Sequence, residues 1–128
     1  MKLVLDAGAL IGIDRGDRRV AALIELGRRN GAGLATTTPV LAQAWRDGAR
    51  QAQLSRLLPM IDTRIVDVEA AKRAGELLAM SHTSDVVDAL LAQVVAPGDQ
   101  LLTSDPGDLA ALLSARGIAA AIVSVCLI

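Results

Sequence analysis

The chain has 128 residues, a length suited to one hydrophobic core, so we predict a single domain over residues 1–128. Hydrophobic residues make up 52% of the sequence, which excludes an intrinsically disordered chain. The formal net charge of −1 indicates no particular partner. Trp45 is the only aromatic residue, so the core must be built from leucine, valine, isoleucine and alanine.

The charges are distributed unevenly between the two halves of the chain. Residues 1–64 carry ten basic and six acidic side chains, whereas residues 65–128 carry three basic and eight acidic ones. This asymmetry allows a basic surface to lie beside an acidic site.

Composition and the two ends of the chain favour the cytoplasm. Cys126 is the only cysteine, so no internal disulfide can form, and we expect it to be a small buried side chain on the last strand. The opening MKLVLDAG reaches an acid before any long apolar segment, unlike a signal peptide. The uncharged ending GIAAAIVSVCLI has twelve residues, too few to span a membrane as a helix. The apolar excess indicates that some apolar surface contacts a partner.

Short apolar runs bounded by polar residues predict strands, and helical spacing of apolar residues between them predicts helices. Because strands and helices alternate, we expect an α/β fold with a parallel sheet covered on both faces. The AGALIGI segment after the first strand is interpreted as a turn. The strands are predicted at residues 2–6, 33–37, 63–68, 99–103 and 119–125. The helices are predicted at residues 17–29, 38–48, 50–58, 69–80, 84–95 (capped by Ser84) and 105–115.

Asp88 is an unexpected residue within the apolar stretch SDVVDALLAQVV. On a helix it shares a face with Leu91, Ala92 and Val95, and a carboxylate on a core face is costly unless a partner compensates it. The partner could be a basic residue of the core or a bound cation.

Three acids are predicted to converge at one edge of the sheet. Asp6 follows the first strand and Asp105 the fourth, and ligands of open parallel sheets bind beyond such carboxyl ends. Asp88 lies in the first turn of the helix that precedes the fourth strand. Clustered carboxylates select hard cations such as Mg²⁺ or Mn²⁺, which suit phosphodiester hydrolysis because they activate water and stabilise charge on phosphate.

Each acid also has a structural interpretation. Asp6 could simply end a strand and cap the following turn, and Asp105 could be only the N-cap of its helix. Asp85 and Asp108 lie in first turns, where a negative charge is favourable for the helix dipole.

Several segments, taken in order, resemble PIN-domain nucleases, most closely the VapC-type toxins of bacterial toxin–antitoxin pairs. They are VLDAGALI, TTPVLAQAWRDGARQAQLSRLL, SDVVDALLA and LLTSDPGDL, and the resemblance covers nearly the whole chain. It implies a three-layer α/β/α sandwich around a mostly parallel sheet of about five strands. It also implies a Mg²⁺- or Mn²⁺-dependent endoribonuclease, neutralised by a VapB-like antitoxin and forming a homodimer.

The resemblance assigns catalytic and metal-binding roles to Asp6, Asp88 and Asp105. It gives auxiliary roles to Asp108 and to Thr103, a hydroxyl that helps to hold the acids. Many members of the family carry a glutamate where this chain has Gln43, which removes one negative charge and lowers the expected metal affinity.

The basic half supplies candidate phosphate contacts, each of which could equally be a solvated surface charge. They are Arg15, Arg18 and Arg46, with Arg19 and Arg50 as further members.

Two alternatives to a nuclease remain open. A protein of the same fold could bind RNA or a partner without cutting it, because Gln43 replaces the acid. A phosphotransferase or phosphatase that begins with a strand-end aspartate would want a second aspartate two residues later, and Gly8 stands there.

Overall fold

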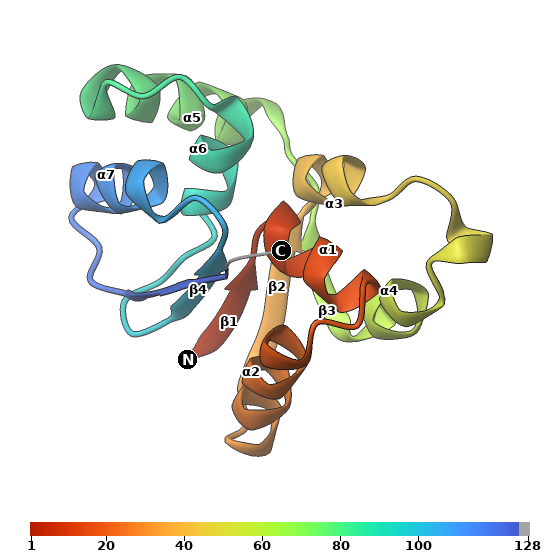
Figure 1. The fold of residues 1–128 in the computed structure, drawn as a ribbon. Coiled ribbons are helices and arrows are strands. Elements are labelled where there is room, and N and C mark those ends of the chain that lie inside the picture. Colours follow the sequence, from red (N-terminus) through yellow and green to blue (C-terminus); the bar gives the residue numbers. More distant parts are fainter. Residues whose placement is uncertain (126–128) are drawn as a thin grey trace.

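The computed structural model describes residues 1–125, and in that range five strands form one sheet (Figure 1). All four strand pairings are parallel and the strand order is β3-β2-β1-β4-β5, which confirms the predicted α/β class and strand number. The strands are β1 (Lys2–Leu5), β2 (Gly33–Thr37), β3 (Ile61–Arg64), β4 (Gln100–Thr103) and β5 (Ala121–Ser124).

Helices cover both faces of the sheet, which gives three layers. Helices α5, α6 and α7 pack on one another on one side, and α1, α2 and α4 pack together on the other (Figure 1). No helix among residues 1–125 is long and apolar enough to cross a membrane. The helices are α1 (Ala7–Asp14), α2 (Arg18–Arg29), α3 (Thr38–Ala44), α4 (Ala52–Leu57), α5 (Val68–Ser81), α6 (Val86–Ala92) and α7 (Pro106–Arg116), with short 3₁₀ turns η1 (Gly48–Arg50) and η2 (Leu58–Met60).

Burial decreases from the centre of the sheet to its edges. Leu3, Val4 and Leu5 of the central strand are fully buried, whereas Ile122 and Val123 of the edge strand β5 are only partly buried. A strand covered on both faces needs a continuous apolar run, and KLVL supplies one.

The segment predicted as a turn after β1 is helix α1. Gly8, Ala9, Leu10, Gly12 and Ile13 are all buried, so the helix is apolar all round and lacks the one-sided pattern that identifies a surface helix. The Asp6 carboxylate starts it by accepting a hydrogen bond from the Ala9 amide at 2.9 Å.

Two predicted boundaries are wrong. The third strand ends at Arg64, and the apolar Ile65, which suggested a later strand, is 84% exposed. The helix predicted over residues 38–48 stops at Ala44, because the buried Gln51 side chain accepts hydrogen bonds from the amides of Arg46 and Asp47 and draws the chain away from helical geometry.

The predicted cap of α6 is also wrong. Asp85, not Ser84, is the N-cap, and its carboxylate accepts a hydrogen bond from the Asp88 amide at 3.0 Å. An aspartate accepts this bond as well as a serine does, so the adjacent pair was ambiguous. The expectation for Cys126 lies outside the described residues.

Asp99 ties the start of the sheet together. This 3% exposed side chain accepts hydrogen bonds from the Lys2 amide, the Lys2 Nζ and the Ala96 amide at 2.9, 2.6 and 2.8 Å. Asp99→Ala is expected to lower the free energy of unfolding by about 2–4 kcal/mol in urea denaturation, because it leaves these donors without a partner. Asp62→Ala removes an exposed ion pair with Arg64 and is expected to cost under about 0.5 kcal/mol. Equal losses of unfolding free energy in the two variants would contradict the conclusion that burial makes the Asp99 contacts stronger than the exposed ion pair.

Candidate active site

Four aspartates gather where β1 and β4 end. Asp6 is the N-cap of α1 and directly follows β1, and Asp105 is the N-cap of α7 and lies two residues beyond the neighbouring strand β4. Asp88 and Asp108 lie in the first turns of α6 and α7. The Asp105 side chain makes no capping hydrogen bond, so its carboxylate is not consumed by the helix end.

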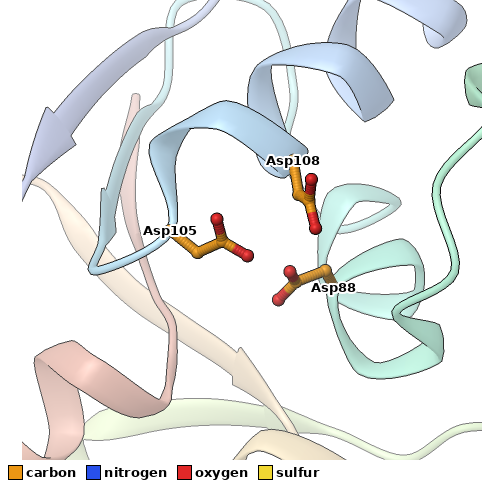
Figure 2. Close-up of side chains that lie close together, drawn as sticks. All are labelled: Asp88, Asp105 and Asp108. Carbon is orange, nitrogen blue, oxygen red and sulfur yellow. The ribbon is translucent and has the colours of Figure 1, made fainter.

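Three of these carboxylates face one another. One oxygen from each of Asp88, Asp105 and Asp108 lies within 4.8 Å of the others, and the three side chains point toward a common space (Figure 2). The sequence predicted convergence of Asp88 and Asp105 and placed Asp108 as an auxiliary. The structure puts Asp108 in the tightest group.

Asp6 lies close enough to this cluster for its charge to act on Asp88. It is 5% exposed, and one oxygen accepts the Ala9 amide while the other accepts the Thr103 hydroxyl at 2.6 Å and the Ser104 amide at 3.0 Å. A carboxylate has about four acceptor positions, so three donors leave one position open. Asp6 therefore supplies negative charge at a fixed place and retains a single lone pair for a cation.

Thr103 links Asp6 to Asp105. Its fully buried hydroxyl donates to the Asp6 carboxylate and accepts a hydrogen bond from the Asp105 amide at 2.8 Å. One side chain thus sets the position of the carboxylate after β1 and of the backbone that carries the acid after β4. The resemblance implied that Thr103 helps to hold the acids, and these two hydrogen bonds are the contacts that it makes.

Close packing supports the same corner. A side-chain carbon at Gly8 would lie 2.4 Å from the Ser104 Oγ and 3.2 Å from an Asp6 oxygen. Glycine at this position lets the first turn of α1 approach the chain after β4. The second aspartate that a phosphotransferase would require could not fit there without moving Ser104.

The surroundings of Asp88 disfavour its ionised form. Burial raises its pKa from 3.8 to about 7, with further contributions from the charge of Asp85, a hydrogen bond and charge from Asp105, and the charge of Asp6. No basic side chain contributes, so the prediction that Asp88 pairs with a core arginine is not supported. Near neutral pH a proton therefore resides on this part of the cluster unless another positive charge replaces it.

The clustered donors fit a hard divalent cation. All are carboxylate oxygens, the donors preferred by Mg²⁺ and Mn²⁺. An octahedral shell with bonds of about 2.1 Å separates its oxygens by about 3–4.2 Å, so the 4.8 Å limit of the three aspartates needs only a small contraction. A bound cation would oppose both causes of the raised Asp88 pKa, burial first and then the charges of the neighbouring aspartates.

The remaining predicted site residues are not among the three clustered aspartates. Gln43 is exposed on α3 and lines a separate pocket, which it shares with Arg15 and Arg46. Arg18 is exposed at the start of α2 and does not line that pocket.

Sequence reasoning missed two contributors to the acidic cluster. Asp85, interpreted only as favourable to the helix dipole, raises the pKa of Asp88 through its charge. A helix N-cap carboxylate binds the amide three residues later, so the spacing Asp85-x-x-Asp88 could have shown that the two aspartates lie close together. The Ser104 amide, which binds Asp6, left no signal in the sequence.

The fold and the acid cluster define an α/β protein with a carboxylate site beyond the ends of its central strands. No protein-family model and no curated protein sequence matches the chain. Among solved structures it is similar to a chain in the crystal structure of VapBC2 from Rickettsia felis bound to a DNA fragment from their promoter. The identity is 14% and the TM-score 0.67, over 97% of this chain and 100% of that chain. This likeness confirms the predicted PIN-like α/β fold.

Proposed function

We propose that this chain is a metal-dependent endoribonuclease toxin whose activity is neutralised by a cognate antitoxin. The observation that carries the proposal is the group of Asp88, Asp105 and Asp108 oxygens within 4.8 Å, beside the buried Asp6. Mg²⁺ or Mn²⁺, when bound, would supply an activated water and would stabilise charge on the phosphate. RNA is the substrate that the resemblance to PIN-domain nucleases favours, and a single domain over residues 1–128 is part of the proposal.

The aspartates have separate tasks in this proposal. Asp88, Asp105 and Asp108 hold the cation, while Asp6 adds charge from its fixed position on Thr103. With a pKa of about 7, Asp88 holds a proton below neutral pH in the absence of a cation and releases it when a cation binds. Metal binding and loss of this proton are therefore linked, and the site binds more tightly as pH rises toward and above 7.

The partners follow from the resemblance and from the fold neighbour. That neighbour is part of a VapBC2 assembly solved with promoter DNA, which supports an antitoxin partner for this chain. Exposed apolar side chains such as Leu26 and Met60, 59% and 46% exposed, suit contact with another protein. A homodimer and a cytoplasmic location belong to the same proposal.

Cleavage of a mixed RNA pool by the purified protein tests the activity. We expect cleavage with Mn²⁺ or Mg²⁺ and none with EDTA. Asp88→Asn and Asp105→Asn are each expected to lower the rate by at least about a hundredfold, because each removes a ligand charge. Asp62→Asn removes an exposed carboxylate on β3 and should cleave like the wild type. Cleavage that survives in both site variants would contradict the proposal.

A binding module without catalysis is the second candidate. It is favoured by Gln43, which lines a pocket with arginines and is a neutral amide where many members of the family that the chain resembles carry a glutamate. It predicts that RNA binds equally well with or without chelator and that no RNA in the pool is cut. Metal-dependent cleavage that requires Asp88 would exclude it.

A further inference from the structure

A polar pocket of about 490 Å³ lies at the far end of α1 from Asp6. Its walls come from the ends of α1 and α3 and from the segment that joins α3 to α4. The polar residues of its wall are Asp14, Arg15, Gln43, Arg46, Asp47, Arg50 and Gln51.

The three arginines of the pocket keep donors available. The Arg15 side chain is exposed and makes no hydrogen bond or ion pair within residues 1–125, although its backbone amide donates to the Ile11 carbonyl. One nitrogen of Arg46 binds the carbonyls of Ala42 and Trp45, which fixes the guanidinium at the end of α3. Arg50 makes only a loose contact of 3.7 Å with Asp47. Guanidinium groups with free donors that line one pocket are suited to a phosphate.

Asp14 adds a hydrogen-bond acceptor to the arginine donors of the pocket. One carboxylate oxygen accepts a hydrogen bond from the Gln51 side chain at 3.3 Å, and the other is buried without a partner. A buried acceptor without a donor is costly, so the site favours a ligand that brings a hydroxyl or amino group next to its anion.

The frame of the pocket is rigid. Gln51 is 7% exposed, and its side chain makes four hydrogen bonds that join the ends of α1 and α3 to the following segment. Its carbonyl accepts from the amides of Arg46 and Asp47, and its amide donates to Asp14 and to the Ala44 carbonyl. Gln51 therefore fixes the backbone of this segment and one oxygen of Asp14 before a ligand arrives, whereas the Arg15 and Arg50 side chains stay exposed.

We propose that this pocket binds one nucleotide of a single-stranded RNA. Arg15 and Arg50 bind its phosphates, and the buried Asp14 oxygen that lacks a partner accepts a hydrogen bond from a sugar hydroxyl or a base amino group. The proposal rests on the proposed function, because Asp6 and Asp14 stand at opposite ends of α1, about 12 Å apart along its axis, a separation that a few linked nucleotides bridge.

This assignment also gives a reason for Gln43. A glutamate there would bring a negative charge to the wall of a pocket that binds phosphate, and it would compete for the arginines. The neutral amide leaves the excess of positive charge available to the ligand.

Binding of a fluorescent single-stranded RNA, measured by anisotropy with EDTA present, tests the pocket without requiring cleavage. The pocket variant Arg15→Gln/Arg50→Gln is compared with Arg28→Gln/Arg29→Gln, which removes the same charge from the exposed end of α2. Between about 50 and about 200 mM salt, the wild type should lose about sevenfold more affinity than the pocket variant, since each phosphate contact adds about 0.7 to the logarithmic salt slope. Equal effects of the two double variants would overturn the proposal.

Asp14→Asn tests the pocket by whether RNA affinity falls or rises. The asparagine can keep the contact with Gln51 but presents an amino group where the oxygen without a partner lies. If that oxygen accepts from the nucleotide, RNA binding weakens by about fivefold or more, although the variant has lost a negative charge. Unchanged or stronger binding would overturn the proposal.

A DNA strand of the same sequence identifies the donor. A loss on Asp14→Asn that is confined to RNA indicates the 2′-hydroxyl, and an equal loss with DNA indicates a base amino group. The cleavage assay is independent of these measurements. Metal-dependent cleavage with normal RNA binding by the pocket variants would overturn the pocket alone, and pocket-dependent binding without any cleavage would contradict only the nuclease.

Discussion

Thr103→Val is expected to lower both activity and stability, although it preserves the shape of the side chain. The fully buried hydroxyl donates to Asp6 and accepts from the amide of Asp105, so valine breaks a bond to a charged group and leaves an amide without its acceptor. We expect a loss of about 2–4 kcal/mol in the free energy of unfolding, measured by urea denaturation. The rate of metal-dependent RNA cleavage should fall by about 10–100-fold, because the acids lose their support.

Thr103→Ser is the matched control. It keeps the hydroxyl and removes only a methyl group, so it should restore most of the cleavage rate even where the lost methyl lowers stability by about 1 kcal/mol. Rescue by serine separates the hydrogen bonds from packing. Equal cleavage rates for the valine and serine variants would show that this hydroxyl does not position the acids.

The central part of the fold was predictable because its chemistry is local. Fully buried parallel strands require short apolar runs, and KLVL and QLLT are such runs. Helix α2 begins at a strong capping residue, Asp17, whose carboxylate accepts the amides of Arg19 and Val20. Helix α1 was not predictable in this way, because a helix buried all round carries no periodic signal.

The sequence predicted which residues lie near the candidate site, but not which of their side chains contact one another. Strand ends at one edge of a parallel sheet bring Asp6 and Asp105 together whatever the details of packing. Which carboxylates meet most closely depends on side-chain directions and on contacts distant in sequence, such as Thr103 with Asp6. The Asp14 oxygen that lacks a partner likewise depends on the Gln51 network, which joins residues 37 positions apart.

Asp88→Asn is expected to stabilise the metal-free protein at neutral pH while it abolishes cleavage. The folded protein holds a proton on Asp88 up to about pH 7, whereas the unfolded chain releases it near pH 3.8. Between these values the folded state binds more protons than the unfolded state, so stability falls as pH rises through the window and stays reduced above it. Asparagine carries no charge and avoids this loss, which we put at about 1–2 kcal/mol after allowing for solvent screening of a half-buried group.

Thermal unfolding in EDTA from about pH 4 to about pH 8 measures the effect. The difference in melting temperature between Asp88→Asn and the wild type should grow with pH in favour of the variant, and a constant difference would contradict the raised pKa. Mn²⁺ at about a hundred times its dissociation constant should reverse the order by adding about 2.7 kcal/mol to the wild type. A carboxylate that destabilises the empty site and stabilises the occupied one is the arrangement expected of a metal ligand, because the same charge that is uncompensated without the cation becomes its partner.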